Sequence, residues 1–222
     1  KSSRSPPKPF ITSTLQQAGS SKLRLSPSDT MRVAQELYEE GYITYMRTDS
    51  PSLSSAATQM SRDAVEEAFG LKFLGNENSK SKAKKAPKNA QEAHEAIRPA
   101  EFKGSFRTPA ETKLEGKKRE LYGLIYRRTL ASVMSKAEYL TKTYLIASDL
   151  SHTNTCKFLS ASFRASERVT LFEGYNAALY MKDTGVSNKK LDGSVDEKIE
   201  LIKGQSIYLA KELVSSTGSK YG

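Results

Sequence analysis

The sequence predicts an α+β fold: a mainly helical, winged-helix-like domain over about residues 10–137, followed by part of an antiparallel β-rich domain over about 138–222. Three observations predict it. Helix-start signals and helical spacing of apolar residues dominate up to about residue 136. Two of these helices are short and joined by a tight turn. After Tyr139 the chain changes to runs rich in β-branched and aromatic residues. We therefore expect a domain boundary near residues 137–140.

The first elements are a linker and two helices. Residues 1–9 are rich in proline, serine and basic residues, which predicts a flexible entry. The run Ser13-Thr-Leu-Gln16 fits a capping box, so a helix is expected at about 14–22. Ser26-Pro-Ser-Asp29 is a stronger start signal for a second helix. Its apolar face and its left-handed cap are predicted to be Met31, Ala34, Leu37, Tyr38 and Gly41. Such a pair of helices either docks on DNA or serves only for packing.

The next elements alternate between extended and helical. Residues 42–47 are rich in β-branched and aromatic residues and predict a strand, which Asp49-Ser-Pro51 ends. Ser54 or Ser55 caps a helix to about Phe69, with Met60, Ala64 and Ala68 on one face and Gly70 closing it. Residues 75–89 form a basic low-complexity loop, because too little apolar surface is present to offset the ordering entropy. Asn89 begins a short helix that ends at Arg98-Pro99.

The last third of the chain is predicted to begin helical and then become a sheet. Thr108-Pro-Ala-Glu111 repeats the capping signal and predicts a helix to about Lys136, which Gly116 can divide in two. Four strands are then expected, at residues 139–148, 156–165, 168–180 and 198–209.

Composition limits the function classes. Lys and Arg total 35 against 25 Asp and Glu, a formal net charge of +10, which either favours an anionic partner such as nucleic acid or reflects simple solubility. Cys156 is the single cysteine, which excludes a disulfide framework and a Cys-x-x-Cys zinc site. No apolar run approaches the roughly 18 residues of a membrane span. The chain begins at Lys1 without a secretory signal, so we expect a fragment of a longer protein.

Tyr45 and Arg47 are the residues with the clearest chemical signal. A strand tyrosine is usually a packing residue, but here Arg47, Thr48, Asp49 and Ser50 follow it directly. Residues two apart in a strand share a face, so the phenol and the guanidinium are expected on one side. A phenol has a pKa of about 10, and a nearby cation favours its phenolate form. A guanidinium can also hold a phosphate with two parallel hydrogen bonds. The pair therefore suits phosphoryl transfer through a covalent intermediate.

Four segments together resemble the type IA DNA topoisomerases. The run Gly41-Tyr-Ile-Thr-Tyr-Met-Arg-Thr-Asp-Ser50 resembles their active-site signature. Pro9-Phe-Ile-Thr-Ser-Thr-Leu-Gln-Gln17 resembles the entry to their tyrosine domain, and Ala34-Gln-Glu-Leu-Tyr-Glu-Glu-Gly41 the helix before the active site. Ala90-Gln-Glu-Ala-His-Glu-Ala-Ile-Arg-Pro99 resembles the histidine motif after it. The methionine at position 46 of this motif resembles the bacterial topoisomerase I branch of the family. Residues 140–222 match only by general pattern, and would form part of the arch through which DNA passes.

The resemblance implies roles for individual residues. Tyr45 would form a 5′-phosphotyrosine, Arg47 would contact the scissile phosphate, and His94 would act near the same phosphate as a contact or as a proton relay. The candidate DNA-contacting residues are Tyr38, Arg47, Thr48, Asp49, His94 and Arg98.

Alternatives remain open for several of these residues. A lone histidine such as His94 is otherwise a surface or capping group. Tyr38 either stacks on a base or fills the apolar face beside Leu37. Glu95 and Arg98 either orient His94 or form an ordinary solvated pair.

The resemblance also implies what lies elsewhere. Members of the family bind Mg²⁺ through an acidic cluster in a separate domain, and no such cluster appears here, so no metal is expected on this fragment. In the full enzyme, one strand of single-stranded or underwound DNA would be cut, passed and resealed without ATP, relaxing negative supercoils. We expect a monomer in the bacterial cytoplasm, in the nucleoid or in a DNA-containing organelle, and no membrane partner. The fragment alone is expected to be inactive in relaxation. The alternatives are a non-catalytic single-stranded-DNA-binding module of the same fold and an unrelated winged-helix regulator.

Overall fold

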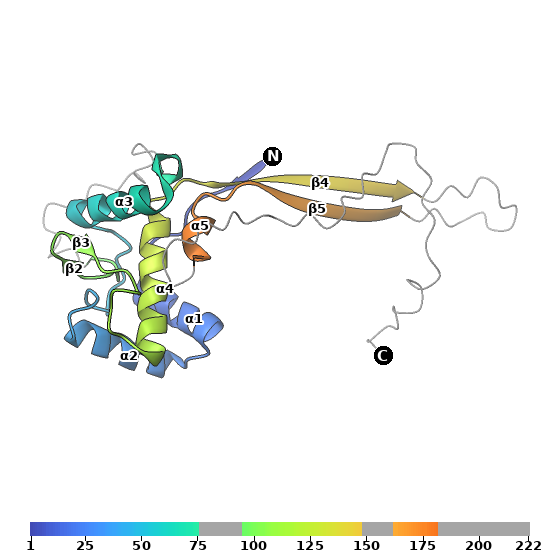
Figure 1. Cartoon of the computed structure of the whole chain (residues 1–222). Coiled ribbons are helices and arrows are strands. Elements are labelled where there is room, and N and C mark those ends of the chain that lie inside the picture. The colour runs from blue at the N-terminus through green and yellow to red at the C-terminus, as the bar shows by residue number, and fades with distance from the viewer. Residues whose placement is uncertain (76–94, 148–161, 182–222) are drawn as a thin grey trace, which may run out of the picture. The chain divides into compact units, whose positions relative to one another are not determined.

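The computed structural model describes residues 1–75, 95–147 and 162–181, and it combines helices with small sheets (Figure 1). The helices are α1 (Thr12–Leu23), α2 (Pro27–Glu39), α3 (Ser55–Phe69), the 3-10 helix η1 (Leu71–Phe73), α4 (Gly116–Ser132) and α5 (Asn176–Leu179). The strands are β1 (Ser2–Arg4), β2 (Glu101–Phe102), β3 (Ser105–Phe106), β4 (Ala137–Ala147) and β5 (Ser162–Phe172). The mixture of helix and sheet agrees with the predicted class, whereas its winged-helix detail stays a prediction.

Helix α2 begins as the sequence predicts, and α1 does not. The Ser26 hydroxyl oxygen accepts a hydrogen bond from the Asp29 N–H at 3.0 Å, and proline occupies the first helical position. Helix α1 begins at Thr12, two residues before the predicted start, so Ser13 is not its cap. The Thr14 hydroxyl instead accepts a hydrogen bond from the Ile11 N–H at 3.0 Å. A side-chain hydrogen bond therefore forms at the start of α1, as the sequence predicts, but two residues earlier than predicted.

Helices α3 and α4 show one accurate boundary and one correction. Helix α3 has Ser54 as its cap and ends before Gly70, as predicted, although its buried residues are Ala57, Ser61 and Val65. Helix α4 begins at Gly116, eight residues after the predicted start at Thr108. The Glu111 carboxylate accepts hydrogen bonds from the Thr108 N–H at 2.7 Å and from its hydroxyl at 2.9 Å. The capping signal therefore closes a turn rather than a helix.

The core of the helical part is built around α4, which packs against α1, α2, α3 and α5 (Figure 1). The middle of α4 is enclosed on every side, because all residues from 121 to 126 are buried, although charged residues precede and follow this stretch. Its buried residues are Leu121, Tyr122, Gly123, Leu124, Ile125, Tyr126, Thr129, Leu130 and Ala131. The other helices and the segment that carries Tyr45 are arranged around this helix.

Several strands and one predicted helix differ from the sequence prediction. Residues 2–4, expected in a flexible linker, form β1 and pair antiparallel with β4, with Ser2 opposite Tyr139. Residues 162–172 form one strand, β5, where the sequence predicts a break between strands at 156–165 and 168–180. After Phe172 the chain turns and forms α5, so the predicted strand does not extend to residue 180. The predicted helix from Asn89 is wrong at residues 95–98, which are not helical, and its earlier part lies outside the described residues. So do residues 76–89 of the basic loop and the predicted strand at 198–209.

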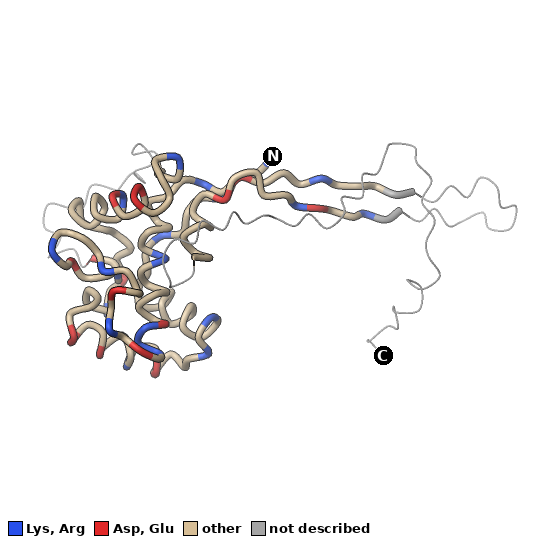
Figure 2. The backbone as a smooth tube through the Cα atoms, in the orientation of Figure 1, with Lys and Arg blue, Asp and Glu red and all other residues tan. Residues whose placement is uncertain are grey.

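The chain divides into two units, residues 1–142 with 166–188 and residues 143–165 with 189–222. Strand β4 lies between β1 and β5 in a three-stranded sheet, and β2 with β3 forms a two-stranded one. Basic and acidic residues are interspersed over the described helices and strands (Figure 2). The first of these units contains all the described residues that the sequence marks as a candidate site.

Candidate active site around Tyr45

The segment that carries Tyr45 begins at a sharp reversal after α2. Gly41 has φ = 74°, the left-handed conformation predicted for it. The Gly41 N–H donates to the Tyr38 carbonyl at 2.9 Å, and the Tyr42 N–H donates to the Leu37 carbonyl at 2.8 Å. These two bonds define a Schellman motif, which satisfies the last carbonyls of α2. The motif fixes the direction in which residues 42–50 leave the helix.

One side of this segment is held by residues 96–100. The Thr44 N–H donates to the Arg98 carbonyl at 2.9 Å, and the Ala100 N–H donates to the Tyr42 carbonyl at 2.8 Å. The Thr44 hydroxyl donates to the Ala96 carbonyl at 2.8 Å and accepts from the Arg98 N–H at 3.0 Å. Only an isolated bridge between Ile43 and Pro99 is β-like. The strand predicted at 42–47 is therefore wrong, because a side-chain hydroxyl takes part of the role of a backbone ladder.

The other side is held by Thr12, at the start of α1. Its hydroxyl oxygen accepts from the Thr48 N–H at 2.9 Å and donates to the Met46 carbonyl at 2.8 Å. Its own N–H donates to the Thr48 carbonyl at 3.0 Å. Thr12 is not among the site residues predicted from the sequence. The available signal was its place in the Pro9–Gln17 run that resembles the entry to the tyrosine domain.

Burial alternates along the anchored segment. Met46 and Thr48 are buried, at 1% and 6% exposure, whereas Tyr45 is 44% exposed and Arg47 and Asp49 are also exposed. The tyrosine and the arginine are thus both accessible to a large substrate, while the residue between them anchors the chain in the core. The Thr48 hydroxyl accepts from the Ser50 N–H at 3.1 Å, so its predicted contact with DNA competes with a structural bond.

Tyr38 lies directly beside Tyr45. The two ring centroids are 5.3 Å apart and the rings meet edge to face at 65°. Tyr38 is 43% exposed while Leu37 is fully buried, so the alternative that Tyr38 fills the apolar face with Leu37 is wrong. Stacking of Tyr38 on a base stays a prediction.

Two other tyrosines illustrate how different the environment of Tyr45 is. Tyr122 and Tyr126 lie in the core on α4, at 1% and 4% exposure. The Tyr122 hydroxyl donates to the Arg107 carbonyl at 2.6 Å. Burial raises the pKa of Tyr122 above its ordinary value and raises the pKa of Tyr126 to about 12. Both hydroxyl groups are therefore unsuited to attack a DNA backbone.

Glu95 and Arg98 form a partly buried pair rather than a solvated one. Their side chains are 24% and 12% exposed, and two guanidinium nitrogens of Arg98 bond both carboxylate oxygens, at 2.8 Å and 2.7 Å. The Ser54 N–H also donates to Glu95, at 2.8 Å, which joins the pair to the start of α3. Burial acts to raise the pKa of Glu95, but hydrogen bonds from Arg98 and Ser54 leave that pKa below its usual value. His94 lies outside the described residues.

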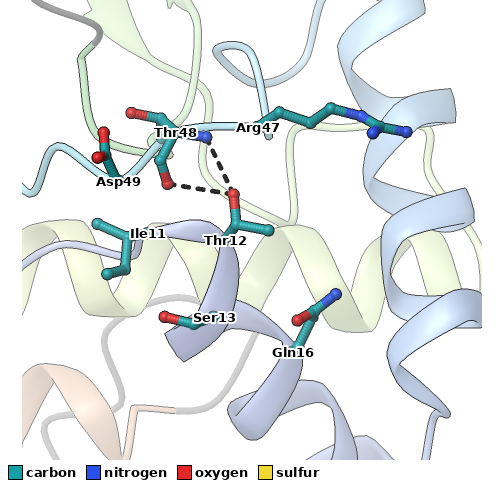
Figure 3. A pocket seen from close by; sticks show the side chains of 7 residues that line it. All are labelled: Ile11, Thr12, Ser13, Gln16, Arg47, Thr48 and Asp49. Carbon is teal, nitrogen blue, oxygen red and sulfur yellow. Dashed lines mark hydrogen bonds between the residues drawn. The ribbon is translucent and has the colours of Figure 1, made fainter.

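A pocket of about 410 Å³ lies between the first turns of α1 and the active-site segment (Figure 3). It is lined by Ile11, Thr12, Ser13, Gln16, Arg47, Thr48 and Asp49. The pocket brings the first turn of α1 next to Arg47, and Figure 3 shows the Thr12 hydroxyl turned toward the backbone of Thr48. The predicted phosphate contact Arg47 thus borders a hollow with several polar groups.

Neither a metal cluster nor a membrane-spanning helix occurs in the described parts of the chain. Within residues 1–75, 95–147 and 162–181, no three His, Cys, Asp or Glu residues are grouped to hold a metal ion. Among the same residues, no helix is both long and apolar enough to cross a bilayer. Glu36 of α2 and Glu40, which follows that helix, form ion pairs with Lys118 of α4.

Comparison with known proteins gives the family. A mixed fold of helices and small antiparallel sheets displays an exposed tyrosine and arginine on an anchored segment. The DNA topoisomerase family matches residues 1–216, and the chain belongs to this family. It is 47% identical over 172 residues to DNA topoisomerase 1 of Synechococcus elongatus, covering 78% of this chain and 18% of that protein. It is 40% identical over 217 residues to DNA topoisomerase 1 of Streptomyces coelicolor, covering 98% of this chain and 22% of that protein.

A solved structure agrees with these relatives. The full-length topoisomerase I of Thermotoga maritima matches with a TM-score of 0.62 and 34% identity, over 82% of this chain and 28% of that one. The resemblance to bacterial type IA topoisomerases inferred from the motifs is therefore confirmed. The chain spans about a fifth of the length of the two relatives above.

Proposed function

We propose that this chain supplies the nucleophile of a type IA DNA topoisomerase, with Tyr45 as the residue that cuts one DNA strand. The observation that carries the proposal is the exposure of Tyr45 and Arg47 on a segment anchored from both sides. An anchored backbone with two accessible functional groups meets the need of catalysis for fixed geometry at an open surface. Membership of the DNA topoisomerase family supports the same assignment.

The proposed step is a transesterification. The Tyr45 oxygen attacks the phosphorus of a phosphodiester, its proton is lost, and the bond from phosphorus to the 3′ oxygen breaks. The departing 3′ oxygen takes up a proton, which leaves a free 3′-hydroxyl and a 5′-phosphotyrosine. Arg47 would hold the phosphate through its planar donors and stabilise the charge that develops on its oxygens. Reversal of the step reseals the strand without ATP, because the ester to Tyr45 preserves the bond energy.

The remaining roles belong to this proposal as well. His94 would act near the scissile phosphate, and Asp49 and Thr48 would line the approach of the DNA. Because Arg98 donates to Glu95 and to the Pro99 carbonyl, its geometry favours positioning residues 95–100 over a direct DNA contact. The helical domain would have winged-helix character, and residues 138–222 would be part of the arch.

Mg²⁺ is proposed for the full enzyme but not for these residues. In the described part of the chain no three His, Cys, Asp or Glu residues are grouped to hold a metal ion, and Glu36 and Glu40 form ion pairs with Lys118. We propose that another domain of the full enzyme binds the ion. The proposed substrate is single-stranded or underwound DNA, handled by a monomer inside the cell.

A second candidate function is a non-catalytic single-stranded-DNA-binding module. It is favoured by the net charge of +10. The two candidates differ in one property: only the nucleophile assignment requires a covalent bond to DNA.

The test compares Tyr45→Phe with the parent sequence in a full-length topoisomerase that contains residues 1–222. The substitution removes one oxygen, so binding to labelled single-stranded DNA should persist while denaturant-resistant adducts disappear. Tyr180→Phe, at an exposed tyrosine on the C-terminal side of α5, is the matched control and should form adducts like the parent. Adduct formation by Tyr45→Phe at the parent level would exclude Tyr45 as the nucleophile.

A further inference from the structure

We propose that Thr12 is a positioning residue that sets the backbone of Arg47, and through it the phosphate contact. The inference rests on the proposed function of Arg47 and adds a residue from a distant part of the sequence. Thr12 and Arg47 are separated by a complete helix pair, yet they line the same pocket (Figure 3).

The Thr12 hydroxyl contacts both peptide groups that flank Arg47. The Met46 carbonyl belongs to the peptide before Arg47 and receives the hydroxyl proton at 2.8 Å. The Thr48 N–H belongs to the peptide after it and donates to the same oxygen at 2.9 Å. The backbone of an amino acid has two soft dihedral angles, which lie between those two peptides. One hydroxyl group therefore restrains both dihedral angles of Arg47.

A backbone hydrogen bond also joins Thr12 to this segment. Its backbone N–H donates to the Thr48 carbonyl at 3.0 Å. The first N–H groups of a helix have no partner within the helix, so the active-site segment satisfies one of them. Met46 and Thr48 are buried, so it is costly to leave their peptide groups without a hydrogen-bond partner.

Helix α1 gives Thr12 a rigid support. Leu15, one turn further along, is fully buried in the core. At Gly19, an added Cβ would approach the Thr30 side chain of α2 to 2.4 Å, so the two helices are in close contact there. The position of Thr12 relative to α2 is thereby fixed, and α2 leads through its Schellman motif into the segment that Thr12 holds. The segment that carries Arg47 is therefore held by both α1 and α2.

The arrangement requires a hydroxyl group at position 12 and not a particular volume. Serine can accept and donate in the same way, whereas valine has the shape of threonine and can do neither. Small misplacements of a catalytic group cost up to about 100-fold in rate. Loss of the hydroxyl should therefore weaken the contribution of Arg47 to cleavage more than it weakens DNA binding.

The test is a double-mutant cycle in a full-length topoisomerase that carries residues 1–222, with single-turnover cleavage of a labelled oligonucleotide as the main readout. Thr12→Val should slow cleavage by about 10-fold to 100-fold with little change in oligonucleotide affinity. Thr12→Ser should stay within about 3-fold of the parent. In an Arg47→Ala background, Thr12→Val should have almost no further effect, because coupled groups are not additive.

Two controls keep the outcome interpretable. Thr58→Val removes a hydroxyl that donates to a carbonyl at 2.9 Å in the first turn of α3, and it should leave cleavage unchanged. Trypsin cuts after arginine, so native-state cleavage at Arg47 reports the local backbone without reference to activity. It should accelerate in Thr12→Val and not in Thr12→Ser. The acceleration at Arg47 should exceed that at Arg32, an exposed arginine of α2, because a general loss of stability would accelerate cleavage at both sites.

The outcomes separate this inference from the function on which it rests. Additive losses from Thr12→Val and Arg47→Ala, or unchanged trypsin cleavage at Arg47, would overturn the positioning role alone. Parent-level cleavage by Arg47→Ala would overturn the phosphate role of Arg47 and this inference with it. Loss of adducts in Tyr45→Phe tests the nucleophile independently of both.

Discussion

The ring of Tyr38 meets the ring of Tyr45 edge to face, with 5.3 Å between the centroids. Tyr38 lies in the last turn of α2, and Tyr45 lies on the segment that the Schellman motif directs away from that helix. Both rings are more than two-fifths exposed. The helix therefore supports one side of the proposed nucleophile while the other remains open to DNA.

Tyr38→Ala should slow DNA cleavage, because aromatic pairs of this kind contribute about 0.5–1.5 kcal/mol beyond buried area. If that contribution orients Tyr45, the single-turnover rate should fall by about 2-fold to 10-fold. Tyr38→Phe keeps the ring and should behave like the parent. Equal losses in both variants would indicate that the hydroxyl of Tyr38, and not its ring, matters.

Arg47→Lys should reduce cleavage more than binding. Lysine keeps the charge but loses the planar arrangement of donors that matches a phosphate. We expect cleavage and relaxation to slow on the order of 100-fold, the cost of one lost donor at a developing negative charge. The affinity for a single-stranded oligonucleotide at fixed salt should change far less. Relaxation at the parent rate would make Arg47 a structural residue.

Glu95→Gln should flatten the acid dependence of stability. The pKa of Glu95 in the folded protein lies below its ordinary value of 4.5. Burial raises this pKa, but the hydrogen bonds from Arg98 and Ser54 lower it by more. The ionised carboxylate therefore stabilises the fold above its unfolded-state pKa, and this contribution disappears as pH falls through the lower folded-state pKa. Urea unfolding from about pH 3 to about pH 7 measures it. Glu101→Gln, at an exposed site in β2, is the control. A parent-like pH profile for Glu95→Gln would contradict the coupling.

Purified residues 1–222 should bind single-stranded DNA weakly and should not relax supercoiled plasmid at any Mg²⁺ concentration. The binding follows from the net charge of +10, and it should weaken steeply as salt rises because counterions are released. Titration of a labelled oligonucleotide at several salt concentrations measures it. Affinity independent of salt would show that basic groups do not dominate the contact. Plasmid relaxation by this chain would show that the metal-binding apparatus lies within it.

Sequence patterns predicted several helix ends, because a helix cap depends only on residues close to it in the sequence. Ser26, Ser54, Gly41 and Gly70 each mark a helix end in the structure as they do in the sequence. A cap depends on a few neighbouring residues, so its signal is complete within one segment. At Thr108 the same signal closes only a turn, since the apolar helix face begins later, at about Leu121.

The sequence predicts which residues form the candidate site, but it does not predict the contacts that hold their segment in place. Tyr45 and Arg47 were identified from chemistry and resemblance, and both are exposed as that chemistry requires. The strand predicted for residues 42–47 is absent because its partners are the Thr12 and Thr44 side chains and residues 96–100. Contacts over such sequence separations leave no periodic pattern. The same reason explains why Thr12 and the pairing of β1 with β4 could not be predicted.

The most direct test of the central claim is to map the covalent bond between protein and DNA. Adducts of a full-length topoisomerase carrying this chain are trapped with denaturant, trimmed with nuclease and digested with trypsin. Cleavage after Arg32 and Arg47 releases a peptide that contains Tyr38, Tyr42 and Tyr45. Fragmentation of this peptide by mass spectrometry should place the nucleotide on Tyr45, attached through a 5′ phosphate. A nucleotide on Tyr38, on Tyr42 or on any other peptide would contradict the account.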